Sequence, residues 1–323
     1  MTSVHSVPAR HSLPDRLAAG DVLLLDAAMG TDLDRRGLTT RLPLWSALGV
    51  LERPDLVREV HADNLRAGAD VITTCTFRTT GRTLVRGGID PARASELDAL
   101  AARLADDARR ETGREDALVA GSIAPLEDCY SPDLTPDDAT AYAEHRRQAA
   151  SLAAAGVDFL MIETMPTIRE AVAALRAADE TGIPATVGFV CARPDPDGPV
   201  LLLSGEPLRD AVAAVVPFAP AAVLVNCAPA PVIAAAMAEL RDATAIPYGG
   251  YANAGRIDDV RGWEPDPAMT GDDYAAAVAP WLDLGARIVG GCCGSHAGHT
   301  AGVRALLDAR HAGSAQPSRS GRR

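Results

Sequence analysis

The chain has 323 residues, 47% of them hydrophobic, and a formal net charge of −12; all 31 of its basic residues are arginine. This length suffices for one large domain, whereas the acidic balance without a basic cluster argues against nucleic acid or membrane as partner, and no apolar run could cross a bilayer. The absence of lysine excludes a lysine Schiff base, ordinary pyridoxal-phosphate catalysis and a Walker-type phosphate loop.

The first segment, residues 1–19, is polar and contains prolines, and we expect it to be flexible. It has no apolar core of the kind found in signal peptides, which predicts a cytoplasmic protein. Six cysteines in a cytoplasmic chain of this length indicate metal-binding, catalytic or buried thiols rather than a disulfide framework.

Eight short apolar runs then recur along the chain. Most are continuous, as expected of parallel strands that are covered on both faces. They are residues 22–29, 71–77, 117–123, 159–164, 185–191, 222–227, 247–252 and 287–292. Between them lie segments rich in alanine and arginine with helical spacing, for example 54–67, 91–110, 139–155, 167–180 and 232–241.

Eight alternations of strand and helix predict a single-domain (β/α)8 barrel of the TIM type over residues 20–311. A doubly wound open sheet is the alternative, but no G-x-G-x-x-G motif follows a strand. Residues 312–323 are small, polar and basic, and we expect a disordered tail.

Active sites of such barrels lie at the C-terminal ends of the strands. Those ends carry a set of polar, thiol and aromatic candidates: Asp26, Thr74, Cys75, Thr76, Phe77, Ser122, Glu163, Thr164, Cys191, Asn226, Cys227, Tyr251, Asn253, Cys292 and Cys293.

The thiols are the most specific of these candidates. Cys292 and Cys293 stand between glycines at the end of the last strand, and Cys227 ends the sixth, two positions away around the ring. Three thiolates with one open position are typical of catalytic zinc, so we predict Zn²⁺ bound by these three residues. A redox disulfide between Cys292 and Cys293 is the alternative reading. Cys75 or Cys191 could also contribute a ligand, whereas Cys129 lies in a loop and looks incidental.

Two acids also stand at strand ends. Glu163 closes an apolar strand, where a charge usually has a function. Asp26 is similar, although an aspartate there could simply cap a helix. Of the seven histidines only His296 and His299 lie near a strand end, and they could equally begin a helix. This scarcity of histidine disfavours zinc-dependent hydrolysis.

Nine segments resemble, in order, motifs of the homocysteine S-methyltransferase family. They are DAAMGTDL at 26–33, LWSA at 44–47, VH at 60–61, AGADVI at 67–72, ETMP at 163–166, SGEPL at 204–208, VNC at 225–227, YANAG at 251–255 and GGCCG at 290–294. The resemblance implies a barrel in which Cys227, Cys292 and Cys293 bind zinc. It also implies that Asp26 and Glu163 hold the amino-acid end of homocysteine.

The chain departs from the family pattern near the expected pocket. Ala27 replaces a glycine, and Cys75 stands where asparagine is common. Residues 122–125 and 251–253 each differ by one residue from the usual motif. These departures leave open which methyl donor is used and whether the acceptor is homocysteine or a related thiol or selenol.

For the acceptor, the expected chemistry is methylation of a metal-bound thiol, which loses its proton near neutral pH and attacks a methyl group in line. Glu163 and Asp26 would pair with the substrate ammonium, and backbone groups around Ala27 and Ala28 would take its carboxylate. Asn226, beside Cys227, is a further candidate for substrate binding.

For the donor, the ring faces of Trp45, Phe77 and Tyr251 are candidates to contact a cation, although each could serve only in packing. We favour a sulfonium, S-methylmethionine or S-adenosylmethionine. Folate and corrinoid routes normally need further domains, and betaine-using relatives carry a longer C-terminal arm than the short tail here suggests. Betaine, or a corrinoid or folate donor in trans, remains the alternative.

The partners expected for this chemistry are small molecules, with no nucleic acid or membrane, and the protein would be a monomer or small homo-oligomer. A zinc hydrolase and a non-catalytic metal or thiol sensor are the less favoured functions.

Overall fold

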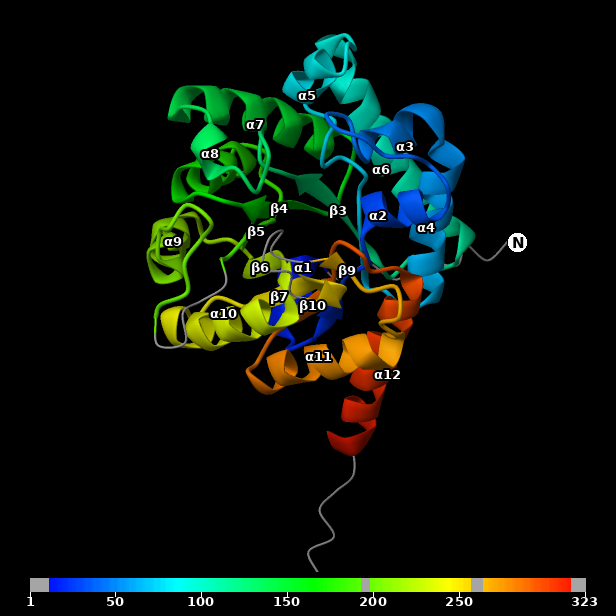
Figure 1. Cartoon of the computed structure of the whole chain (residues 1–323), viewed down its shortest axis with the longest axis vertical. Coiled ribbons are helices and arrows are strands. Elements are labelled where there is room, and N and C mark those ends of the chain that lie inside the picture. The colour runs from blue at the N-terminus through cyan, green and yellow to red at the C-terminus, as the bar shows by residue number, and fades with distance from the viewer. Residues whose placement is uncertain (1–11, 193–197, 257–263, 315–323) are drawn as a thin grey trace, which may run out of the picture.

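Eight parallel strands form a ring that is surrounded by helices (Figure 1). The computed structural model describes residues 12–192, 198–256 and 264–314. The hydrogen-bonded order is β1-β10-β7-β6-β5-β4-β3-β2, and a parallel bridge between Leu25 and Val71 joins the two ends. The strands are β1 (Leu23–Leu24), β2 (Val71–Thr73), β3 (Leu118–Ile123), β4 (Phe159–Met165), β5 (Ala185–Phe189), β6 (Ala222–Pro229), β7 (Tyr248–Asn253) and β10 (Ile288–Gly291). The predicted (β/α)8 barrel is confirmed.

A helix follows each strand and packs on the outside of the ring. The larger ones are α4 (Pro54–Arg66), α6 (Ala94–Glu111), α7 (Asp138–Ala154), α8 (Ile168–Asp179), α9 (Leu208–Val215), α10 (Ala230–Ala243), α11 (Gly271–Asp283) and α12 (Ala297–Ser314). Shorter elements lie in the connections: α2 (Met29–Arg35), α3 (Ala47–Glu52), α5 (Gly81–Arg86), the 3-10 helices η1 (Pro91–Arg93), η2 (Pro132–Leu134) and η3 (Val216–Phe218), and the antiparallel pair β8 (Gly255–Arg256) and β9 (Glu264–Pro265). None of the helices described is long and apolar enough to span a membrane.

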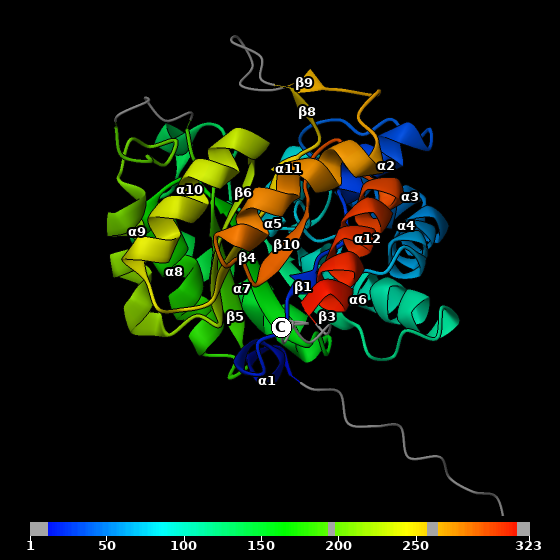
Figure 2. The ribbon, with the colours of Figure 1, turned by 90° about the horizontal axis from the view of Figure 1, so that it is seen from below.

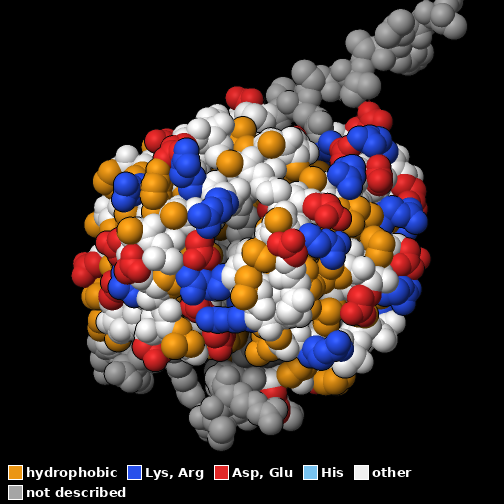
Figure 3. Space-filling view, turned by 90° about the horizontal axis from the view of Figure 1, so that it is seen from above, with side chains coloured by type: hydrophobic (Ala, Val, Ile, Leu, Met, Phe, Trp, Pro, Cys, Tyr) orange, Lys and Arg blue, Asp and Glu red, His pale blue; other side chains and the backbone are white. Residues whose placement is uncertain are grey.

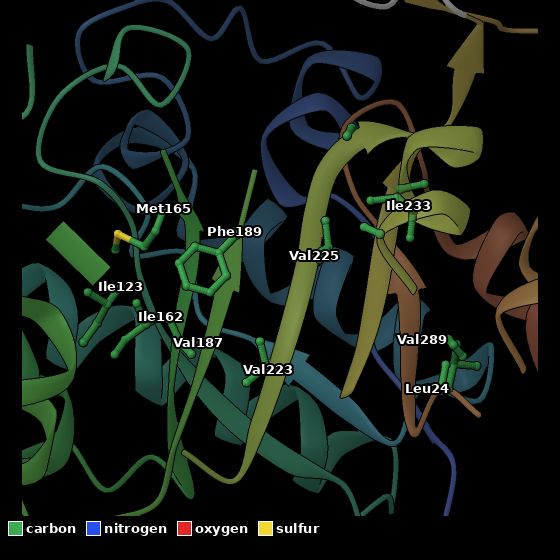
Figure 4. Close-up of a cluster of buried hydrophobic side chains, with 14 of the residues drawn as sticks. Leu24, Ile123, Ile162, Met165, Val187, Phe189, Val223, Val225, Ile233 and Val289 are labelled. Atoms are coloured by element: carbon green, nitrogen blue, oxygen red, sulfur yellow. The ribbon is translucent and has the colours of Figure 1, made fainter. Parts of the chain in front are cut away.

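The core has two layers because successive side chains of a strand point to opposite faces. Figure 4 shows part of the layer between strands and helices, with Val187, Phe189, Val223 and Val225. The residues between them face the inside of the barrel. That inner layer contains Leu23, Leu25, Val71, Leu118, Ala120, Phe159, Met161, Ala222, Leu224, Tyr251 and Ile288.

The bottom of the barrel is closed by a helix that was not predicted. Helix α1 (Leu13–Ala18) begins with a capping box between Ser12 and Asp15, and Leu13 and Leu17 join the inner layer. Flexibility of residues 12–19 was therefore a wrong expectation, because two leucines four positions apart lie on one face of a helix and bury together. Residues 1–11 lie outside the described part of the chain. At the other terminus, α12 continues through Ser314, and 315–323 also lie outside it.

Figure 2 shows the two ends of the barrel, with α1 below and the β8–β9 pair above. The upper end carries the C-terminal ends of the strands. On the sides, Figure 3 shows arginine and acidic side chains interspersed over one face. Across the described chain many arginines pair with acidic side chains; Arg82, for example, pairs with Glu127 and Glu144.

Candidate active site

A cavity of about 390 Å³ lies where the C-terminal ends of the strands converge. Its walls come from residues at or near the ends of β1, β2, β3, β4, β6, β7 and β10 and from the loops that follow them. Nearly all of the predicted site residues line it, namely Asp26, Ala27, Trp45, Phe77, Glu163, Cys227, Tyr251, Cys292 and Cys293. The strand-end candidates that do not line it are Thr76, Thr164, Cys191, Asn226 and Asn253.

Three thiols converge on one wall of this cavity. The sulfur atoms of Cys227, Cys292 and Cys293 all lie within 4.8 Å of one another. Cys227 reaches this position through a left-handed backbone, with φ of 57°, where the register of β6 shifts. The Cys292 N–H donates to the Ala252 carbonyl at 2.7 Å, and the Cys293 carbonyl accepts from the Ala254 N–H at 2.8 Å. The end of β7 and the residue that follows it thus fix the backbone of the cysteine pair.

The spacing of these sulfur atoms fits a common metal ion. Tetrahedral zinc with Zn–S bonds of about 2.3 Å holds its sulfur ligands roughly 3.8 Å apart, and the Cys227 and Cys293 sulfurs are 3.9 Å apart. All six cysteines are free thiols in this structure. Hydrogen bonding to Cys292 and burial raise the pKa of the Cys227 thiol well above its ordinary value. A bound metal cation would stabilise the deprotonated form of these neighbouring thiols, which burial and mutual proximity otherwise disfavour.

The other three cysteines lie apart from this group. The thiol of Cys75 donates to the Ser46 carbonyl at 3.2 Å, and burial raises its pKa to about 12. Cys191 is buried and pairs by a backbone bridge with Leu202. Cys129, which looked incidental in the sequence, lines the cavity, and burial raises its pKa to about 12. Within the described residues, only the Cys227, Cys292 and Cys293 thiols are close enough together to share one ion.

Two buried carboxylates face the same cavity. Asp26 accepts hydrogen bonds from the N–H and the hydroxyl of Thr73, at 2.9 and 3.0 Å. Glu163 accepts from the Ser122 hydroxyl at 2.5 Å and from the Tyr251 hydroxyl at 3.2 Å. Burial raises the pKa of each to about 7. Among the described residues no arginine forms an ion pair with either carboxylate. His61 lies 4.0 Å from Asp26, but burial lowers its pKa to about 4, so it is neutral at pH 7. A substrate ammonium would be the missing counter-charge.

Asn226 lies behind the cavity wall instead of in it. Its amide oxygen accepts from the Thr164 N–H at 2.9 Å, and its amide nitrogen donates to the Thr164 hydroxyl at 2.7 Å. Thr164 has a left-handed φ of 61° and follows Glu163 directly. Both ends of the Asn226 side-chain amide are hydrogen-bonded to Thr164. The prediction that Asn226 contacts the substrate is therefore corrected, because Asn226 holds the backbone next to Glu163 instead.

The backbone around Ala27 is also already used. The Ala27 N–H donates to Asn64 at 3.1 Å, and the Ala28 N–H donates to the Ser295 hydroxyl at 3.1 Å. The Ala27 and Ala28 N–H groups therefore already have acceptors within the protein. Met29 and Gly30, which follow them at the start of α2, also line the cavity, and binding of a substrate carboxylate by backbone groups in this segment stays a prediction.

The aromatic candidates divide into two kinds. Trp45 and Phe77 form an edge-to-face pair with centroids 5.7 Å apart on the cavity wall. Tyr251 is buried in the inner layer of the barrel and presents its hydroxyl to Glu163. The histidines near the cysteines are occupied elsewhere, since His299 lies 3.1 Å from the Met269 carbonyl and stacks edge-on against His296.

Comparison with known proteins identifies the family. The sequence profile described as homocysteine S-methyltransferase matches residues 23–307. The chain belongs to this family. The homocysteine S-methyltransferase of Escherichia coli is 34% identical over 289 residues, which cover 84% of this chain and 91% of the relative. The homocysteine S-methyltransferase YbgG of Bacillus subtilis is 30% identical over 290 residues, or 84% and 90% of the two chains.

A solved homocysteine methyltransferase has the same fold. The metallated form of MmuM from Escherichia coli superposes with a TM-score of 0.77 at 31% identity and covers 90% of this chain and 98% of its own. The protein is therefore a methyltransferase of the homocysteine S-methyltransferase family, as the sequence motifs predicted. The family is metal-dependent, and the Cys227, Cys292 and Cys293 group can hold a metal ion.

Tyr130 and Arg78 are among the cavity-lining residues that the sequence analysis did not predict. The Tyr130 hydroxyl lies 3.1 Å from the Cys227 sulfur and 3.2 Å from the Cys227 carbonyl. Its loop is held by Glu170, which accepts from the Leu126 N–H at 2.8 Å. Aromatic and basic side chains next to the strand-end motifs were the available signal.

Proposed function

We propose that the protein transfers a methyl group from a sulfonium donor, S-methylmethionine or S-adenosylmethionine, to the thiol of L-homocysteine, giving methionine. Zinc held by Cys227, Cys292 and Cys293 is the proposed cofactor. The observation that carries this proposal is the single cavity in which three thiols, two buried carboxylates and an aromatic pair face one another. Each group matches one part of the two substrates.

The three cysteines provide the place for the acceptor sulfur. When bound, zinc lowers the pKa of a substrate thiol so that it reacts as a thiolate. Cys227, Cys292 and Cys293 leave room for such a fourth sulfur because the cavity opens directly beside them. Their own negative charge keeps the site electron-rich, which favours nucleophilic sulfur over activation of water.

The two carboxylates would orient the acceptor. A bound ammonium lowers the pKa of a neighbouring carboxylate, so Glu163 and Asp26, with a pKa of about 7 in the free protein, would be ionised in the complex. Ser122 and Tyr251 hold the Glu163 carboxylate in place through their hydroxyls. The substrate is thereby fixed at its amino end while its sulfur reaches the cysteines.

The aromatic pair would receive the donor. A sulfonium over the faces of Trp45 or Phe77 is stabilised by their ring quadrupoles. Holding the cation there, in the same cavity as the acceptor sulfur, brings the two reactants together without water between them. After transfer both products are neutral at sulfur, and the attraction to the rings is lost.

A donor panel tests this proposal. Zinc-loaded protein is incubated with homocysteine and, separately, S-methylmethionine, S-adenosylmethionine, betaine or methylcobalamin at equal concentration, and methionine is measured. We expect methionine from at least one sulfonium and none with the Cys227→Ser variant. Methionine from betaine or methylcobalamin alone would overturn the donor while leaving thiol methylation intact. Replacing homocysteine by cysteine in a parallel series tests the acceptor.

A further inference from the structure

The cavity contains a buried cation that neither the cysteines nor the carboxylates use. Arg78 follows β2 directly after Phe77, lines the cavity and is only 9% exposed. One terminal nitrogen, Nη1, donates to the Glu127 carbonyl at 3.0 Å. The Nε atom is buried and has no hydrogen-bond partner among the described residues. The guanidinium carbon lies 5.3 Å from the centroid of the Phe77 ring.

An unpartnered buried N–H is costly unless a ligand satisfies it. No acidic side chain in the described parts of the chain forms an ion pair with Arg78, which sets it apart from Arg82 and Arg86 on the surface nearby. The free Nε edge of a guanidinium is suited to a carboxylate, which it binds through two parallel hydrogen bonds.

Charge balance in the cavity points to the same ligand. Arg78 is the one basic side chain among the described residues that line it, whereas Asp26, Asp128 and Glu163 are acidic. The Ala27 and Ala28 N–H groups already have side-chain acceptors. A substrate carboxylate that enters the cavity therefore meets a single full positive charge, at Arg78.

We propose that Arg78 binds the α-carboxylate of the methyl donor and so selects sulfonium donors that carry an amino-acid group. This inference rests on the proposed function. Arg78 stacks against Phe77, and Phe77 contacts Trp45, so a sulfonium at the aromatic pair has its own carboxylate within reach of the guanidinium. The amino end of the acceptor belongs instead to the acidic pair, Asp26 and Glu163.

The test compares donors with and without a carboxylate. Steady-state kinetics are measured for wild type, Arg78→Gln and Arg78→Lys with S-methylmethionine and with (3-aminopropyl)dimethylsulfonium, its decarboxylated analogue. Loss of a charge-assisted hydrogen-bonded contact should lower kcat/KM for S-methylmethionine roughly tenfold to a hundredfold in Arg78→Gln. Arg78→Lys, which keeps the charge, should recover part of this loss. For the analogue, the variants should match wild type within about threefold, because no carboxylate is present to lose.

Arg82→Gln is the matched control. Arg82 also binds Glu127, but through its carboxylate and outside the cavity. Arg82→Gln should leave the preference for the carboxylate-bearing donor unchanged. If Arg78 only anchored the loop at Glu127, Arg78→Gln would impair both donors equally, and the proposal would be overturned.

A binding titration separates this proposal from the proposed function. S-methylmethionine and its analogue are titrated by calorimetry into wild type and Arg78→Gln, whether or not methyl transfer occurs. We expect the wild type alone to bind S-methylmethionine more tightly than the analogue. Equal affinities in the wild type, or a rise in the KM of homocysteine rather than of the donor, would refute the assignment. Selective binding without any methionine formation would instead refute the proposed reaction.

Discussion

Replacement of Glu163 by glutamine should make the protein more stable and less active. Burial raises the pKa of this carboxyl from 4.5 to about 7, so the folded state holds the proton more tightly than the unfolded state. Stability contributed by the protonated group is complete below pH 4.5 and is lost as the pH rises to 7. This difference in pKa between the folded and unfolded states lowers the free energy of unfolding by roughly 3 kcal/mol at a pH where Glu163 is ionised in both.

Glutamine has nearly the same shape and can still hydrogen-bond to Ser122 and Tyr251, but it never ionises. We expect Glu163→Gln to raise the free energy of unfolding by ~1–3 kcal/mol at pH 8 and to leave it nearly unchanged at pH 4.5, measured by urea denaturation of ligand-free protein. The same change should lower kcat/KM for homocysteine ~10–100-fold, because the ammonium loses its charged partner. Glu52→Gln, which removes an exposed carboxylate outside the cavity, is the control and should change neither the stability nor the kinetics. A variant less stable than wild type at pH 8, or one with unchanged kinetics, would refute the reasoning.

Two further predictions concern residues that act through a neighbour. Asn226→Ala removes both hydrogen bonds to Thr164 and should lower the free energy of unfolding by ~1–3 kcal/mol. It should also reduce activity while leaving the metal bound. Urea denaturation, kinetics and metal analysis measure these effects, and unchanged kinetics would contradict a positioning role. Tyr130→Phe removes the hydroxyl beside the Cys227 sulfur and should weaken zinc retention about tenfold in a chelator competition; equal retention would show that this contact does not tune the site.

The cysteines and acids were predictable because the barrel determines where strand ends lie. Glu163 follows Phe159 and Met161 on the inner face of β4, so alternation alone directs it toward the cavity. Cys227 does not obey that rule, because a left-handed residue at a register shift redirects it. Its role was predicted from its place at a strand end, together with the Cys292–Cys293 pair, because the alternation of side chains along a strand does not predict a left-handed residue.

The residues that the sequence missed lie in loops, where tertiary contacts decide the conformation. Tyr130 reaches Cys227 because Glu170 on α8 holds the Leu126 N–H and the Thr135 hydroxyl. Asn226 was misassigned because its neighbour Thr164 comes from a different strand, and only the folded chain brings the two together. Such partners, which are distant along the chain, cannot be predicted from the residues around each position.

Zinc-edge X-ray absorption of the loaded protein tests the account most directly. We predict three sulfur ligands in the free protein and four after addition of homocysteine. Cys227→Ser, Cys292→Ser and Cys293→Ser should each lose sulfur ligands or zinc, whereas the control Cys75→Ser should match wild type. A sulfur count that does not change with homocysteine, or one that falls in Cys75→Ser, would contradict a substrate thiol completing a site made by Cys227, Cys292 and Cys293.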